Sequence, residues 1–325
     1  MKKDLAIGII LLFIGTSIMP PMICAKPENI HGDNKAVGLR GQTISLGFLS
    51  SPTWTWAKSA GDTLPDVGYD VAVDIFGNTY ITGIYWGSIT FGDFTLTSWC
   101  SQVFVAKQSS NGVWLWATCT TGVGNPQEYG GIAVDMFMNV YITGDISGSA
   151  TFGNTTIEGY QGNVFVAKLN RNGVWQWAVS AGREQPKLGW AMGMSIAVDY
   201  FGCAYVTGLF QGKITFGKTT LMNSGHPGVP GNEYSDVFVV KVNSQGVWRW
   251  ATGSSKSSSD DAWGCGIAVD FGRNVYVTGF FYGALSFNAF NLTSQGGSDV
   301  FVAKFNPRGV CQWVTSAGGL ENDPG

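Results

Sequence analysis

Short apolar runs alternate with turn residues along most of the chain, and the same succession returns four times. Each unit opens with an IAVD-type apolar run and continues through the Gly and Asn residues that favour a turn. A VYVTG-type run follows, rich in the β-branched and aromatic residues that suit a strand. No stretch shows sustained helical periodicity, so the pattern predicts strands joined by tight turns. The first apolar run of each unit ends on a repeated aspartate: Asp74, Asp135, Asp199 and Asp270.

The second half of each unit predicts a small hairpin and two further strands. A Phe-Gly or Phe-Asn step, as at Phe91, starts the hairpin or outer excursion. A VFVAK-type strand then leads to a tight turn, as at 170–173, and to a closing GVWxWA strand. By the two-residue period of a strand, we expect the two Trp of that strand on one face. Four main strands in a repeat of about 60 residues predict a propeller blade.

The order IAVD, GN, VYVTG, FVAKLN and Trp resembles the secreted β-propeller repeats known as seven-bladed propeller repeats. Its first half is also similar to the NHL propeller repeat. The resemblance covers roughly residues 54–325, and it implies an exported protein defined by its scaffold rather than by one activity. The chain departs from the pattern at Met138 and Cys203, which replace turn residues, and at Cys311, which stands where the other units have Trp.

The predicted fold is therefore an all-β β-propeller built from four tandem units. Residues 52–325 would hold the repeats, and 26–51 would form an N-terminal segment with one or two strands. The units are expected at about 69–129, 130–193, 194–264 and 265–325.

The ends of the repeat region predict an incomplete ring. A fifth Trp-type strand, at 54–57, lacks the other strands of its unit. The segment after Trp313 matches the linker that precedes unit 1. We therefore expect a fragment of a longer reading frame, because a closed propeller hides its strand edges. The alternative is that residues 37–50 supply substitute strands and close a ring of four or five blades.

The N-terminus predicts a signal peptide over residues 1–25. Lys2 and Lys3 precede an apolar run from Leu5 to Ile18, and Ala25 is a small residue at a plausible cleavage point. A membrane anchor is the alternative, but the run is short for a span of about 20 residues. Cys24 raises lipidation as another, less favoured, outcome. The expected location is secreted or cell-surface, with no membrane span after cleavage.

Composition narrows the range of partners and cofactors. The net charge is −3 and nothing resembles a basic stripe, so a nucleic-acid partner is not expected. No CxxC or Cys/His spacing supports a zinc site, and neither a metal nor a cofactor is expected. We expect Cys100 and Cys119 to be free thiols, with Cys119 opposite Gln102. The other cysteines of the mature chain are Cys203, Cys265 and Cys311, and no two of the five share a repeat position.

The residues that recur in every unit are interpreted as structural. Each repeated Asp would cap the backbone amides of its own turn, as an Asp before a Gly or Asn usually does. The Trp residues would pack between blades. The repeated lysines that end the VFVAK strands, such as Lys107, would extend along the strand and reach solvent.

A ligand site should break the repeat symmetry, so the candidates lie in the loops that differ between units. They are Trp190, His226, Tyr234, Asp260, Asp261 and Trp263. No Ser-His-Asp order or paired-carboxylate pattern emerges, so we expect no enzyme activity.

The expected function is a binding or surface-structural module whose partner is a protein or a glycan at the cell surface. The alternative is a carbohydrate-binding or polysaccharide-processing protein that uses the aromatic loops of units 3 and 4. The sequons at Asn154 and Asn291 are possible glycosylation sites on surface loops.

Overall fold

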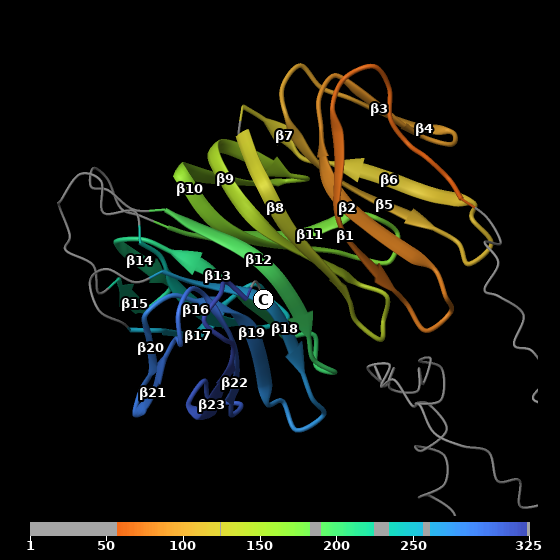
Figure 1. Ribbon diagram of the computed structural model, residues 1–325. Helices are drawn as coiled ribbons and strands as arrows, with labels where there is room; N and C mark the ends of the chain where they lie inside the picture. The colour runs from red at the N-terminus through yellow and green to blue at the C-terminus, as the bar shows by residue number, and fades with distance from the viewer. Residues whose placement is uncertain (1–56, 124, 183–189, 224–233, 256–260, 324–325) are drawn as a thin grey trace, which may run out of the picture. The chain divides into compact units, whose positions relative to one another are not determined.

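The structure, a computed structural model, describes residues 57–123, 125–182, 190–223, 234–255 and 261–323 (Figure 1). The chain divides into two compact units, Met1–Thr53 and Trp54–Gly325, and every described residue belongs to the second. The predicted signal peptide and N-terminal segment therefore lie outside the described residues, as do His226 and Asp260. The described residues contain no helix long and apolar enough to cross a membrane.

The described part of the chain is all-β, and its main strands form four antiparallel sheets of the propeller type (Figure 1). The first blade consists of β1 (Asp66–Val73), β2 (Thr79–Tyr85), β5 (Gln102–Gln108) and β6 (Trp114–Cys119). The second consists of β8 (Asn125–Val134), β9 (Val140–Phe152), β10 (Thr155–Leu169) and β11 (Trp175–Ala181), and the short β7 (Thr121–Gly122) also pairs with β9. The third consists of β12 (Ala191–Val198), β13 (Ala204–Phe210), β16 (Asp236–Val242) and β17 (Trp248–Gly253). The fourth consists of β18 (Ala262–Val269), β19 (Val275–Phe281), β22 (Asp299–Phe305) and β23 (Cys311–Ala317).

The predicted excursion after each Phe step is a two-stranded hairpin. In three blades it is a separate sheet: β3 (Ser88–Phe91) with β4 (Phe94–Thr97), β14 (Lys213–Phe216) with β15 (Thr219–Met222), and β20 (Ala284–Phe287) with β21 (Phe290–Thr293). In the second blade the same hairpin is part of β9 and β10, which are therefore long, and the register of their pairing shifts between Gly159 and Asn163.

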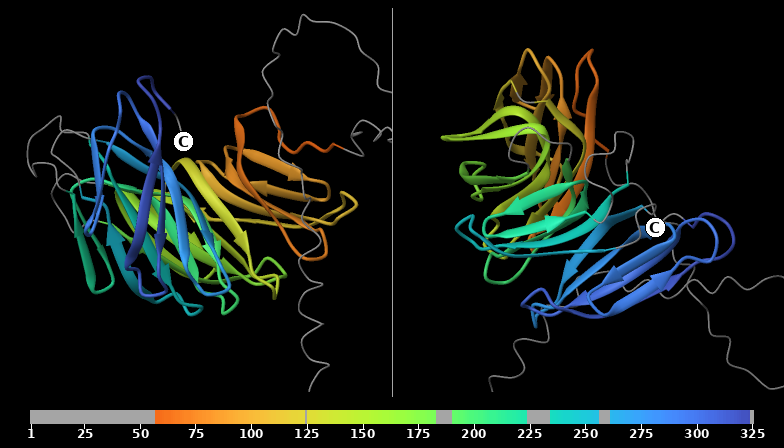
Figure 2. Two further views of the ribbon diagram at one scale, coloured as in Figure 1. Left: turned by 60° about the horizontal axis from the view of Figure 1, so that its bottom comes forward. Right: turned by 90° about the vertical axis from the view of Figure 1, so that its left-hand side faces the viewer.

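The blades stack face to face in chain order, and each interface has its own apolar core. β1 contacts β8, β8 contacts β12, and β12 contacts β18 (Figure 2). One cluster joins the first and second blades, around Tyr80 and Ile142. The second joins the next pair, around Tyr141 and Val206, and the third surrounds Tyr205 and Val277. Each sheet is therefore buried on both faces wherever it has two neighbours.

In the first three blades, the two Trp of the closing strand lie on opposite faces of the blade, which corrects the prediction that they share one face; the fourth blade has Cys311 in place of the first Trp. Trp177 pairs with Lys168 and Trp175 pairs with Leu169, so a β-bulge places one extra residue between the two indoles. Trp175 consequently joins the core shared with the preceding blade, and Trp177 joins the core shared with the following one. The same register shift occurs in the other three closing strands.

The first and last blades of the described array each leave one face open. Val71 of β1 is 57% exposed, whereas its counterparts in the second to fourth blades face a neighbouring sheet. Thr278 of β19 is exposed, although the equivalent Thr207 in the third blade is fully buried beneath Gly264. The described residues thus form an open array of four blades.

Candidate functional site

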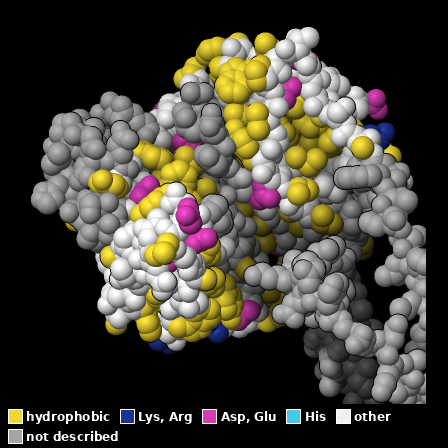
Figure 3. Space-filling view, in the orientation of Figure 1, with side chains coloured by type: hydrophobic (Ala, Val, Ile, Leu, Met, Phe, Trp, Pro, Cys, Tyr) yellow, Lys and Arg dark blue, Asp and Glu magenta, His cyan; other side chains and the backbone are white. Residues whose placement is uncertain are grey.

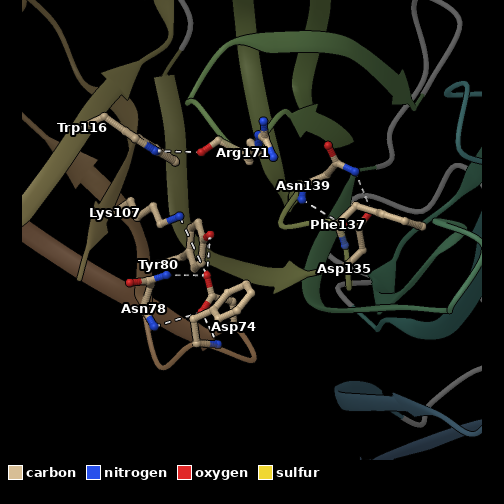
Figure 4. Close-up of polar contacts among 10 residues, drawn as sticks. Asp74, Asn78, Tyr80, Lys107, Trp116, Asp135, Phe137, Asn139 and Arg171 are labelled. Carbon is tan, nitrogen blue, oxygen red and sulfur yellow. Dashed lines mark hydrogen bonds and ion pairs between the residues drawn. The ribbon is translucent and has the colours of Figure 1, made fainter. Parts of the chain in front are cut away.

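Each repeated aspartate organises the turn between the first two strands of its blade. In the first blade, Asp74 Oδ1 accepts the N–H groups of Phe76 at 2.9 Å and Asn78 at 3.0 Å. Its Oδ2 accepts Asn78 Nδ2 at 2.8 Å and the Tyr80 hydroxyl at 3.0 Å (Figure 4). The prediction that these aspartates cap their own turns is confirmed, and the same bonds recur around Asp135.

The lysine at the end of each VFVAK strand lies over the ring of the same tyrosine. Lys107 Nζ is 4.8 Å from the centroid of the Tyr80 ring and 3.8 Å from Asp74 Oδ2. In the third blade, Lys241 Nζ donates to the Tyr205 hydroxyl at 2.6 Å. The prediction that these lysines reach solvent is wrong for this pair, because Lys107 is only 7% exposed and Lys241 only 9%.

The charges in this cluster stabilise the blade and leave no free acid or base. Burial lowers the pKa of Lys107, and the nearby carboxylate of Asp74 opposes that shift. Burial alone would raise the pKa of Asp74, but the hydrogen bonds from Asn78, Phe76 and Tyr80 outweigh it and lower the pKa. The carboxylate is therefore ionised and already saturated with donors, as a structural group is.

In the first three blades, the second Trp of the closing strand attaches its blade to the next one, at the turn between the last two main strands of that next blade, which we call its outer turn. Trp116 Nε1 donates to the Arg171 carbonyl at 3.1 Å, as Figure 4 shows, and Trp177 Nε1 donates to the Ser244 carbonyl at 3.0 Å. A glycine with positive φ lies under each of these three indoles, such as Gly173 at +77°, where an added Cβ would come within 2.8 Å of the Trp116 ring. The structural interpretation of the Trp residues is confirmed, and these contacts hold neighbouring turns in fixed positions.

The rigid turns present apolar side chains to solvent at one end of the blades. Figure 1 shows the β1–β2, β8–β9, β12–β13 and β18–β19 turns in a row at that end. Phe76 is 61% exposed, Phe137 59%, Phe201 61% and Phe271 76%. We call the exposed surface of these four turns and of the four outer turns the turn face. Its apolar residues are Ile75, Phe76, Val113, Met136, Phe137, Val174, Tyr200, Phe201, Val247, Phe271 and Val310.

The turn face is a repeated feature that the sequence analysis did not single out. The capping Asp and the following Gly or Asn are sufficient for the turn, so the apolar residues between them have no role in forming it. Adjacent turns are close, because the Arg273 guanidinium lies 5.3 Å from the ring centroid of Phe201 in the preceding blade. Figure 3, in the orientation of Figure 1, shows apolar areas on the side of the molecule that it views, with several Asp or Glu side chains among them and few Lys or Arg.

The predicted ligand residues lie between the blades and are only partly brought together. Asp261 Oδ1 accepts the N–H of Ser235 at 2.8 Å, and Trp263 Nε1 donates to Asp261 Oδ2 at 3.1 Å. Tyr234, which precedes Ser235, is 38% exposed. Trp190 belongs to the preceding junction, where its carbonyl accepts the N–H of Gln211 at 2.8 Å.

A small cavity between the first two blades adds one residue that the sequence analysis missed. Tyr69, Thr143 and Asp145 are among the residues that line it. Asp145 is 2% exposed and occupies the strand position of Ile84 in the first blade. The sequence shows that Asp145 replaces an apolar residue at this position, but it does not show that the aspartate is buried.

The remaining predicted features are placed as follows. The five described cysteines are free, which agrees with the expectation for Cys100 and Cys119, although Cys119 pairs with Phe104 and not with Gln102. In the part of the chain that the structure describes, no group of three or more His, Cys, Asp or Glu could hold a metal ion. Asn154 and Asn291 are exposed on the excursion hairpins, and their glycosylation stays a prediction.

Comparison with known proteins gives a distant similarity. No protein-family model matches the chain. An uncharacterized WD repeat-containing protein of Acanthamoeba polyphaga mimivirus is 22% identical over 366 residues, which cover 90% of this chain and 26% of that protein. The chain thus spans about a quarter of that relative's length. A protein of unknown function from Bacteroides caccae, known from a crystal structure, has 9% identity and a TM-score of 0.34 over 78% of this chain and 82% of its own. The WD repeat-containing relative agrees with the all-β, propeller-type fold of the described residues.

Proposed function

We propose that this chain is an exported propeller-type binding or surface-structural module that docks through its turn face and is not an enzyme. The turn face carries the proposal: in all four blades, a hydrogen-bonded turn holds apolar side chains in solvent. An exposed apolar surface that extends over several neighbouring turns usually marks an interaction site. The repeated titratable groups support a non-catalytic role, because their hydrogen bonds are made within the blades.

The resemblance to secreted propeller repeats supports export, and the expected signal peptide gives its test. The full chain is expressed in a secreting host, and the exported protein is sequenced from its N-terminus. We expect it to begin near Lys26. Retention of the chain inside the cell with Met1 intact would contradict export.

The docking role is tested on the exported protein with intact cells of the producing strain. We expect the wild-type chain to be retained on the cells. A variant with Phe76→Ser, Phe137→Ser, Phe201→Ser and Phe271→Ser should be released into the medium with an unchanged melting temperature. Equal retention of both proteins, or of neither, would rule out the turn face as the binding face.

A carbohydrate-binding role is the second candidate, and the junction of the third and fourth blades favours it. Trp263 packs on Phe280, with ring centroids 5.4 Å apart, and bonds to Asp261 close to the exposed Tyr234. Aromatic and carboxylate groups together suit a sugar. A glycan array with the wild-type chain and Trp263→Ala tests this role: binding that the substitution abolishes would favour it over the turn face.

A further inference from the structure

The turn face is positively charged on a protein that is negative overall. The eight turns that carry it are all described, and their exposed charged side chains are Arg171, Arg273 and Arg308. The capping aspartates of the same turns are at least partly buried and are hydrogen-bonded inside the turns. The chain as a whole has a net charge of −3. A positive end therefore favours a negatively charged partner.

The apolar side chains of the turn face vary in shape while they remain apolar. The position after the capping Asp holds Ile75, Met136, Tyr200 and Phe271 in the four blades. A protein partner needs a complementary shape for each contact, because interface cores pack as tightly as protein interiors. The fluid boundary of a lipid bilayer takes up an apolar side chain of any shape, so it tolerates this variation.

We propose that the turn face docks on the surface of an anionic lipid bilayer. Its apolar side chains enter the boundary between headgroups and acyl chains, and its three arginines contact the anionic headgroups. Apolar side chains combined with arginines are the usual composition of surfaces that lie on such membranes. The inference rests on the proposed function, since it names the partner of the same binding face.

Flotation of the full chain with vesicles tests this assignment. One set of vesicles is phosphatidylcholine alone, and the other contains about one third phosphatidylserine, which gives the surface a negative potential. We expect the wild-type chain to float with the anionic vesicles and to bind the neutral vesicles much more weakly. Failure of the folded wild-type chain to float with anionic vesicles would overturn the assignment.

Two variants separate the apolar contribution from the charged one. The four Phe→Ser substitutions given above should weaken anionic-vesicle binding by roughly tenfold or more, because each removes an apolar side chain from the boundary. The second variant combines Arg171→Gln, Arg273→Gln and Arg308→Gln. It should weaken anionic-vesicle binding about a hundredfold, at about fivefold for each arginine, and should remove the preference for phosphatidylserine. If the Phe variant does not fold, the Arg variant decides: an unchanged lipid preference would overturn the assignment.

A matched control removes four other apolar side chains, each more than 60% exposed, away from the turn face. These are Trp99, Val123, Met222 and Leu320, which are 80%, 62%, 65% and 88% exposed, and each is changed to Ser. The control should bind anionic vesicles like the wild type, and a loss equal to that of the Phe variant would refute a role specific to the turn face. If cells retain the wild-type chain through its Phe residues but anionic vesicles do not bind it, the lipid assignment fails while the proposed function stands.

Discussion

Replacing Trp177 with alanine would show how much one blade interface contributes to the stability of the array. The indole packs on Tyr141 of its own blade, with ring centroids 6.2 Å apart. On the other side it lies against Gly246 of the third blade, where an added Cβ would be 3.0 Å from the ring. Its Nε1 also donates to the Ser244 carbonyl at 3.0 Å, so the substitution removes packing and a hydrogen bond at once.

Replacing a buried aromatic residue with alanine costs about 3–5 kcal/mol, and the lower end applies here because Trp177 is partly exposed. Trp313→Ala is the matched control, since Trp313 occupies the same strand position in the fourth blade. It packs on Tyr276 at 6.3 Å but is 39% exposed, with no fifth blade among the described residues. We expect a loss of roughly 1–2 kcal/mol there, because less apolar area leaves water.

Urea unfolding of both variants, followed by far-ultraviolet circular dichroism, measures the two losses of unfolding free energy. The expected result is a larger loss for Trp177→Ala by about 1–2 kcal/mol, the difference between the two estimates. Equal losses at the two positions would refute the idea that the second Trp acts mainly on the following blade.

Other substitutions and a pH series test the turns themselves. Met138 has φ +64° where the first blade has a glycine, so Met138→Gly should raise the unfolding free energy by about 0.5–1 kcal/mol, measured by urea unfolding. Cys203 occupies the position of Asn78, whose Nδ2 bonds the capping Asp at 2.8 Å, so Cys203→Asn should add about 1 kcal/mol and raise the melting temperature. Hydrogen bonds lower the pKa values of Asp74 and Asp270 in the folded chain. These ionised carboxylates therefore stabilise the fold fully above the usual aspartate pKa of about 4, and this part of the unfolding free energy is lost as the pH falls below it. A melting temperature that rises on acidification through that range would contradict this.

The regular part of the fold was predictable because its signals are local and repeated four times. The IAVD and VYVTG runs, the tight turns and the excursion hairpins follow from apolar patterning and turn chemistry within about 60 residues. The role of Asp74 was equally predictable, since an Asp that caps its own turn needs no distant partner.

The wrong prediction for the two Trp of a closing strand has one physical cause, the β-bulge in that strand. It inserts one residue between the two Trp, so the simple alternation of sides fails there. The same bulge in the first blade moves the partner of Cys119 from Val103 to Phe104. The prediction of Gln102 was off by one more residue, because the turn closes between Ser109 and Val113. No residue type in the closing strand marks the bulge, so sequence patterning alone could not locate it.

The candidate site was less predictable because exposure depends on neighbouring blades. Lys107 is expected to reach solvent on its own strand, yet it is 7% exposed and lies over the Tyr80 ring beside Asp74. The apolar residues after each capping Asp are indistinguishable in the sequence from core residues. Their exposure follows from the turn geometry, since the Asp directs its hydrogen bonds inward and leaves the next two side chains outside.

This coupling of turn rigidity to exposure determines which substitutions can test function. Asp74→Ala would remove the cap, release Asn78 and unpair the buried Lys107, so lost binding in that variant could come from a disordered blade. Phe76→Ser changes a side chain that is 61% exposed and keeps the backbone N–H that Asp74 accepts. The exposed Phe residues therefore report on docking and the capping Asp residues report on stability. A binding loss in the Phe variants with an unchanged melting temperature can only come from the turn face.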